Sequence, residues 1–128
     1  MDEETFFATF YCAAVTRCYP GKALSGRGDR TASGAEQELC SSWAETELQL
    51  LVPDLVVTVG LTAARRLLGI RALTDAIGKS FVVREAIAIP LPHPSGASGW
   101  LTDASNRAPL GKALTHVRRE LARVTTEP

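Results

Sequence analysis

The chain has 128 residues, of which 45% are hydrophobic, and its 14 basic and 14 acidic residues cancel to a formal net charge of zero. This length and composition fit one ordinary globular domain with a packed core. No apolar stretch approaches the ~20 residues that cross a bilayer, and the acidic start lacks the basic region of a signal peptide. We therefore expect a cytoplasmic monomer with no membrane contact, and zero net charge means that any contact with nucleic acid must come from a local patch.

The first half of the chain predicts a strand, a loop and a helix in that order. Residues 6–16 are rich in aromatic, β-branched and small side chains and run into a Tyr-Pro-Gly turn, which is typical of a strand. Residues 22–33 carry almost no bulky apolar side chains, so they predict an exposed loop. Ser33 and Glu36 match a capping box, which begins a helix that we expect to continue to residue 51. One face of this helix carries Leu39, Trp43 and Leu50.

The second half predicts short strands alternating with helices. A continuous apolar run over 55–59 predicts a buried strand, and the helix expected over 61–68 ends at a glycine. A helical turn over 74–77 and strands over 80–83 and 86–91 follow.

A long loop, 92–105, leads to the last predicted helix, 108–124. Its apolar side chains are spaced four, three, four and three apart, and they are Leu110, Leu114, Val117, Leu121 and Val124. Its arginines, Arg118, Arg119 and Arg123, are expected to stay solvated. The alternation of strands and helices predicts an α/β fold, a three-layer α/β/α arrangement around a short parallel sheet, with no second domain.

His93 lies in a rigid turn directly after the predicted strand 86–91. Pro92 and Pro94 fix their own φ angles and restrict the residues before them, so the imidazole is held in place. Ligands of open α/β sheets bind at the carboxyl ends of the strands, where a histidine can act as a donor, an acid or a base. Residue chemistry alone leaves two interpretations open: a functional group at a site, or a turn histidine that is hydrogen-bonded for structure.

Four blocks of the chain, taken in order, resemble the uracil-DNA glycosylase superfamily, especially its iron-sulfur-associated branch and related bacterial proteins. These blocks are residues 15–21, 28–40, 53–60 and 91–95. The most specific of them is a His-Pro-Ser motif after a strand, and the match runs from about residue 10 to the last helix. The resemblance implies a single glycosylase-like domain over residues 1–128, with the three-layer α/β/α fold of that family.

Enzymes of this family flip a uracil out of DNA and hydrolyse its N-glycosidic bond, since the bond is unreachable in a stacked duplex. The resemblance implies that His93 stabilises the negative charge that develops on the departing base. It implies that Ser95 and Gly96 contact a DNA phosphate, and that Trp100 and Leu101 are candidates for the wedge that fills the vacated stack. For Trp100, a loop aromatic folded onto the core is the alternative.

Basic residues of the exposed loop and of the last helix are candidates for neutralising DNA phosphates, namely Lys22, Arg27, Arg30, Arg107 and Lys112. A solvated surface is the alternative for each of them. The expected partner is DNA that contains uracil or an abasic site.

The chain departs from the family pattern in two places. The family's first motif, Gly-Xaa-Xaa-Pro-Gly, does not occur, so we expect a missing N-terminal strand and motif. Ala14 occupies the position at which the iron-sulfur branch carries the asparagine that reads the uracil edge.

The three cysteines, Cys12, Cys18 and Cys40, are odd in number and irregularly spaced, so we expect reduced thiols rather than disulfides. Cys18 and Cys40 align with the second pair of cluster ligands in the iron-sulfur branch. The first pair comes from an upstream Cys-Xaa-Xaa-Cys, and a 4Fe-4S cluster needs four thiolates. The resemblance therefore implies such a cluster only in a longer chain, and no cofactor for the sequence as it stands.

Three hypotheses about function follow. The first is a DNA-repair glycosylase, a hydrolase that excises uracil or a related damaged base. The second is a non-catalytic or truncated member that binds DNA or a partner through the same face. The third is an α/β small-molecule domain in which His93 is structural.

Overall fold

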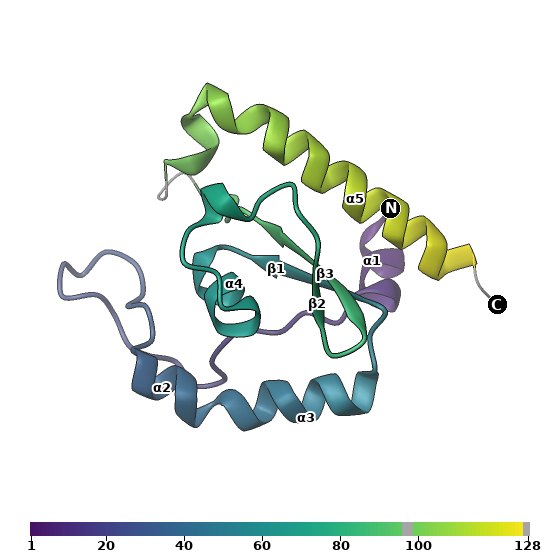
Figure 1. The fold of residues 1–128 in the computed structure, drawn as a ribbon. Coiled ribbons are helices and arrows are strands. Elements are labelled where there is room, and N and C mark those ends of the chain that lie inside the picture. Colours follow the sequence, from purple (N-terminus) through teal and green to yellow (C-terminus); the bar gives the residue numbers. More distant parts are fainter. Residues whose placement is uncertain (96–98, 127–128) are drawn as a thin grey trace. The chain divides into compact units, whose positions relative to one another are not determined.

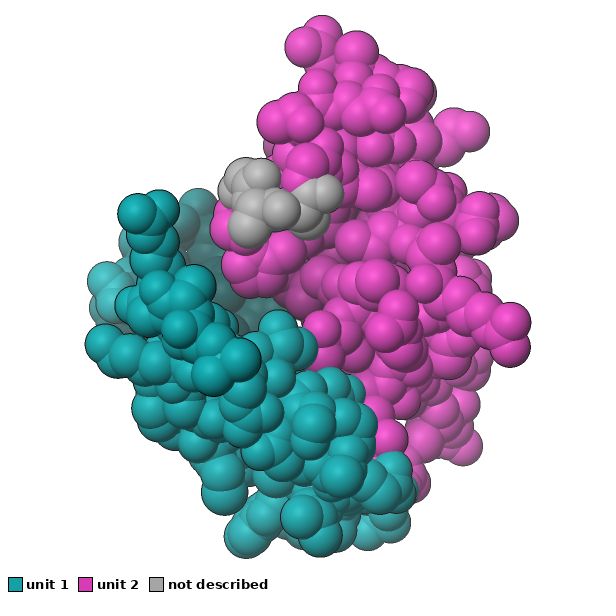
Figure 2. All heavy atoms as spheres, turned by 90° about the vertical axis from the view of Figure 1, so that its left-hand side faces the viewer, with its two compact units in different colours: residues 1–50 teal, residues 51–128 magenta. Residues whose placement is uncertain are grey.

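The computed structural model describes residues 1–95 and 99–126 (Figure 1). The chain forms two compact units, residues 1–50 and 51–128, which Figure 2 shows in different colours. In the part of the chain that is described, no helix is both long and apolar enough to span a membrane. The three cysteines are free thiols.

The first unit begins with a helix where the sequence predicted a strand. Helix α1 (Glu3–Thr9) starts at Asp2, whose carboxylate accepts a hydrogen bond from the Thr5 N–H at 2.8 Å. Glutamates in the first turn add favourable charge at this end of the helix. The strand predicted over residues 6–16 is therefore wrong, and the chain after α1 runs irregularly to the bridge at Lys22.

Two features explain why residues 6–16 do not form a strand: the spacing of the aromatic side chains and the lack of a neighbouring strand. The aromatic residues that favoured a strand are also spaced for a helix, and Phe6 and Phe10 stack with ring centroids 5.0 Å apart. A strand also needs a neighbour to accept its backbone hydrogen bonds. None of the described residues of the first unit forms such a strand.

The exposed loop and the capping box of the first unit are confirmed. Residues 22–33 are mostly exposed, and a bridge between Lys22 and Asp29 closes the loop. Helix α2 (Gly34–Leu39) begins at Ser33, and the reciprocal hydrogen bonds between Ser33 and Glu36 are both present.

The predicted helix over 33–51 is interrupted, because α2 ends at Cys40 and α3 (Ser41–Leu51) follows. The apolar side chains that the sequence places on one face are not part of a core. Leu39, Trp43 and Leu50 are 82%, 60% and 78% exposed.

The second unit contains a three-stranded sheet in the order β1-β3-β2 (Figure 1). Strands β1 (Leu55–Val59) and β3 (Ala86–Leu91) are parallel, and β2 (Phe81–Val83) is antiparallel to β3. The predicted α/β class is confirmed, with a mixed sheet in place of a wholly parallel one. The reason is the two-residue connection between β2 and β3, with Arg84 at a φ of 56°, since so short a connection joins only antiparallel strands.

Among its described residues, the second unit is completed by two α-helices and three 3-10 turns. Helix α4 (Leu61–Leu68) begins after Gly60 and ends at Gly69, whose left-handed φ of 68° stops it as predicted. Helix α5 (Arg107–Thr126) lies within two residues of its predicted limits. The 3-10 turns are η1 (Leu73–Asp75), η3 (Trp100–Thr102) and η4 (Ala104–Asn106).

The core of the second unit lies between the sheet and both α-helices. Its buried members are Ala64, Ile70, Leu73, Ala76, Ile77, Ile89, Trp100 and Ala113. On α5, Leu110 and Val117 pack against this cluster as predicted, whereas Leu114 is 46% exposed. Ala113 is fully buried instead, so the buried face of α5 is turned from Leu114 toward the side that carries Ala113.

The arginines of α5 are exposed, as predicted, and two of them pair with a glutamate on the same helix. Glu120 is buried, and its carboxylate contacts Arg119 at 2.9 Å and Arg123 at 3.2 Å. Hydrogen bonds from these two guanidinium groups lower the pKa of Glu120. Two of the three arginines are therefore ion-paired.

Candidate active site

His93 lies at the carboxyl edge of the sheet, where β1 and β3 end side by side. The register pairs Val59 of β1 with Leu91 of β3, and the Gly60 N–H donates to the Leu91 carbonyl at 2.8 Å. The chain then passes through buried Pro92 to His93, which is exposed. The sheet edge thus presents the imidazole at the place where α/β folds bind their ligands.

Gly60 is packed against the His93 side chain. A Cβ atom at position 60 would lie 3.3 Å from His93 Cβ and 3.6 Å from His93 Cδ2. Gly60 also has a φ of 85° and a ψ of 167°, a conformation that is essentially restricted to glycine. Two independent constraints therefore require glycine at the end of β1.

Ser95 holds one nitrogen of the imidazole. Its backbone N–H donates to His93 Nδ1 at 3.1 Å, and its Oγ lies 2.8 Å from the same nitrogen. A backbone N–H can only donate, so Nδ1 accepts and the ring proton of the neutral imidazole is on Nε2. Among the described residues Nε2 has no partner, so it is a hydrogen-bond donor available to a ligand.

The two candidate wedge residues in the loop after the motif differ in burial. Trp100 is 9% exposed and belongs to the core cluster, and its carbonyl accepts a hydrogen bond from Asn106 Nδ2 at 2.8 Å. The structure thus has Trp100 folded onto the core. Leu101 is 39% exposed, so its apolar side chain is accessible at the surface. Gly96, a predicted phosphate contact, lies outside the described residues.

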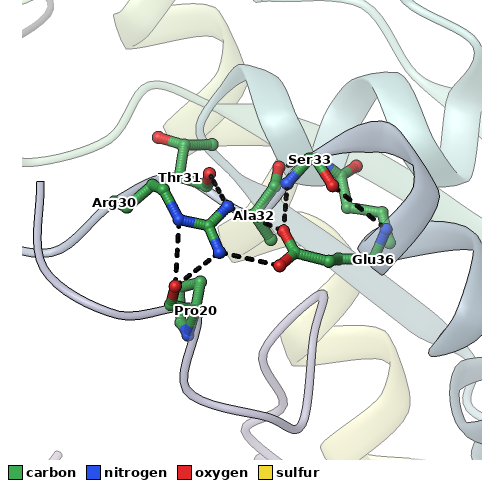
Figure 3. Close-up of polar contacts among 7 residues, drawn as sticks. Pro20, Arg30, Thr31, Ala32, Ser33 and Glu36 are labelled. Atoms are coloured by element: carbon green, nitrogen blue, oxygen red, sulfur yellow. Dashed lines mark hydrogen bonds and ion pairs between the residues drawn. The ribbon is translucent and has the colours of Figure 1, made fainter.

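Of the predicted basic contacts, Arg30 is already engaged within its own unit (Figure 3). Its guanidinium binds Glu36 at 2.7 Å and the Pro20 carbonyl at 2.9 Å. Hydrogen bonds from Arg30 and Ser33 lower the pKa of Glu36 from 4.5 to about 2. Arg30 thus ties the exposed loop to the start of α2. Lys22 in the same unit and Arg107 at the start of α5 are exposed.

Cys18 and Cys40 line one cavity of about 120 Å³ in the first unit. The other lining residues are Thr16, Tyr19, Pro20, Glu36 and Leu39. Two thiols are half of what a 4Fe-4S cluster needs, and in the described part of the chain no group of three His, Cys, Asp or Glu residues converges. The residues present therefore do not fit this cluster.

Sequence reasoning located His93 but missed its contact with Gly60. The available signal was the glycine directly after an apolar strand, because parallel neighbouring strands bring the residues after their carboxyl ends together. The order of strands in the sheet, which the sequence did not reveal, was needed to use that signal.

Comparison with known proteins shows which family the chain belongs to. The family model described as "Uracil DNA glycosylase superfamily" matches residues 2–118. A search of curated proteins found no significant match. The matched region includes all four sequence blocks, the sheet and the His93 turn. The chain therefore belongs to the uracil-DNA glycosylase superfamily, and this membership supports a DNA glycosylase-type function in general.

Proposed function

We propose that this protein is a DNA base-excision glycosylase that hydrolyses the N-glycosidic bond of uracil or of a related damaged base. The observation that carries the proposal is the His93 imidazole, packed against Gly60 and held at Nδ1 by Ser95, with its Nε2–H unoccupied by any described residue. Family membership is the second support.

The chemistry requires a donor of this kind. Water attacks C1′ of the deoxyribose, the bond from C1′ to the base nitrogen breaks, and its electron pair leaves with the base. The water gives up one proton to solvent, and the departing base anion takes up a proton, so the products are the neutral base and an abasic sugar. The sugar passes through an oxocarbenium-like state while negative charge spreads onto a base oxygen. The Nε2–H of His93 donates a hydrogen bond to that oxygen and stabilises the charge as it forms.

The fold contributes to the reaction by orienting the His93 imidazole. A donor that is already positioned needs no reorganisation when the base departs, so its effect on the barrier is larger than that of a mobile group. The Gly60 contact limits where the ring can lie, and the Ser95 hydrogen bonds fix its rotation and its tautomer. Leu101 is the residue that we assign to the gap left by the flipped nucleotide.

The test is base excision from a uracil-containing single-stranded oligonucleotide, read as alkali-labile abasic sites. His93→Ala is expected to lower kcat by about 10² to 10³, the range for removing one preorganised donor. His93→Gln, which keeps an N–H donor, is expected to retain more activity than His93→Ala. Circular dichroism of each variant checks that it is folded.

Two results would count against the proposal. Unchanged excision by folded His93→Ala would show that His93 is not the donor. Absence of excision by the wild-type chain, together with salt-dependent binding to uracil or abasic DNA, would favour the non-catalytic, DNA-binding alternative.

A further inference from the structure

A second group of polar side chains comes together where the segment before β2 meets α5. A Cβ atom at Gly78 would lie 3.1 Å from the Pro109 carbonyl oxygen and 3.5 Å from Lys112 Cβ. Ser80 Oγ lies 3.3 Å from His116 Nδ1. Residues 78–80 therefore run along the first turns of α5, which brings the backbone of Lys79 close to the turns that carry Lys112 and His116.

This group, which we call the Lys79 patch (Lys79, Ser80, Lys112 and His116), carries uncompensated positive charge. Both lysines are exposed, and neither has an ion-pair partner among the described residues. The carboxylate on α5, Glu120, is occupied by Arg119 and Arg123. Residues 76–83 contain no acidic side chain. In a chain with zero net charge, such a patch is a local site for anions.

The sheet topology places the Lys79 patch at the same end of the sheet as His93. β2 is antiparallel to β3, and its first residue, Phe81, pairs with Ala88. Ser80 and Lys79 precede Phe81, so they lie toward the carboxyl end of β3, from which His93 follows (Figure 1). Both features belong to the second unit.

We propose that Lys79, Lys112 and His116 bind the phosphodiester backbone of the DNA strand that reaches His93. This inference rests on the proposed function and adds a backbone-binding site to it. Two ammonium groups and an imidazole, with a serine hydroxyl beside them, are donors suited to phosphate oxygens. Continuity with the sheet edge that holds His93 favours a nucleic-acid strand over an acidic protein segment, because the strand must already be present there.

The experiment measures binding of the full chain to fluorescent oligothymidine over a series of salt concentrations. Oligothymidine contains no uracil, so binding is read without excision. The variants are Lys79→Ala, Lys112→Ala and the double variant. The matched control is Arg84→Asn, which removes one exposed positive charge from the β2–β3 turn at the opposite end of the sheet. Asparagine tolerates the left-handed backbone at this position.

Each lysine that contacts a phosphate contributes ~0.7 to 0.9 to the slope of log K against log salt. We expect each single variant to lower the slope by about that amount, the double variant to lower it by roughly twice as much, and Arg84→Asn to leave it unchanged. Equal slopes for the double variant and Arg84→Asn would overturn the inference. Tighter binding to polyglutamate than to oligothymidine would also overturn it, in favour of an acidic protein partner.

The excision and binding measurements distinguish a failure of the glycosylase proposal from a failure of the Lys79 patch. If the wild-type chain excises uracil and the double variant keeps the wild-type slope, the Lys79 patch is wrong and the glycosylase proposal stands. If the chain binds oligothymidine through the patch but excises nothing, the glycosylase proposal is wrong and the backbone site stands. If it binds no DNA at all, both are wrong.

Discussion

Gly60 and His93 are in contact at the carboxyl ends of the parallel strands β1 and β3, between which 26 residues of the chain intervene. The absent side chain of Gly60 makes room for the imidazole, and the Gly60 N–H closes the end of the ladder at Leu91. Since a Cβ atom at position 60 would lie 3.3 Å from His93 Cβ, any larger residue must displace the ring or the strand end.

Gly60→Ala is therefore expected to lower both the free energy of unfolding and the kcat of excision, with a loss of kcat beyond what the loss of stability explains. The backbone conformation alone costs ~1 to 3 kcal/mol for a residue with a side chain, and the displaced imidazole adds a loss of kcat. Gly69→Ala is the control, because Gly69 also has a positive φ, of 68°, but open space around its Cβ position. Denaturant unfolding and excision are measured for both. An equal loss of kcat in the two variants would show that crowding of His93 is unimportant.

Ser95→Ala tests how the imidazole is held. The variant removes the hydroxyl at 2.8 Å and keeps the backbone N–H at 3.1 Å, so Nδ1 retains a donor. One hydrogen bond contributes ~1 kcal/mol, which corresponds to a decrease in kcat of roughly fivefold. The decrease should be much smaller than that of His93→Ala, as measured by single-turnover excision. Equal losses would mean that the hydroxyl acts directly on the substrate.

Substitution of Trp100 should lower stability, whereas substitution of Leu101 should weaken DNA binding. Trp100 is a member of the core cluster, so Trp100→Ala is expected to lower the free energy of unfolding by ~3 to 5 kcal/mol. Leu101 is 39% exposed, so Leu101→Ala should change that free energy by no more than ~0.5 kcal/mol while weakening binding to abasic DNA. Unchanged DNA binding by Leu101→Ala would remove this residue from the site.

Glu36 should make the first unit sensitive to acid. Its folded pKa of about 2 lies below its ordinary value of 4.5, so the carboxylate contributes stability that is fully present above the ordinary value. That contribution is lost as the pH falls from 4.5 toward 2. Glu36→Gln should therefore destabilise the protein at neutral pH but not near pH 2.

Urea unfolding at the two pH values measures this difference, with Glu45→Gln as an exposed control on α3. A difference between wild type and Glu36→Gln that is independent of pH would show that the Arg30 ion pair is not the cause. The Arg30 guanidinium should then be tested as a DNA contact instead.

Ile89 tests the core of the second unit. It is fully buried in β3, between the sheet and the helices. Ile89→Val should cost ~0.5 to 1.5 kcal/mol and Ile89→Ala ~2 to 5 kcal/mol in the free energy of unfolding, because each leaves a cavity of increasing size. Val82→Ala, at a side chain that is 71% exposed, should cost no more than ~0.5 kcal/mol. Comparable losses at positions 89 and 82 would contradict this core.

The sequence predicted β1, α4 and β3 with their observed limits, because local signals define these elements. Pro53 and Asp54 precede β1, Gly60 and Gly69 bound α4, and a continuous apolar run marks each strand. The same local reasoning was wrong over residues 6–16, where aromatic content favours a strand and capping favours a helix. Pairing decides between them, and pairing is not local.

By itself, the sequence determined the residue types of the site: His93 in a proline-restricted turn, and Ser95 two residues later, within reach of the same ring. The tertiary structure alone decided that Gly60 abuts His93, that Trp100 belongs to the core, and that the segment around Gly78 packs against Lys112. Each of these contacts joins segments that are distant in sequence, or depends on which face of a loop is buried. The order and direction of the strands set those distances, and no local pattern encodes them.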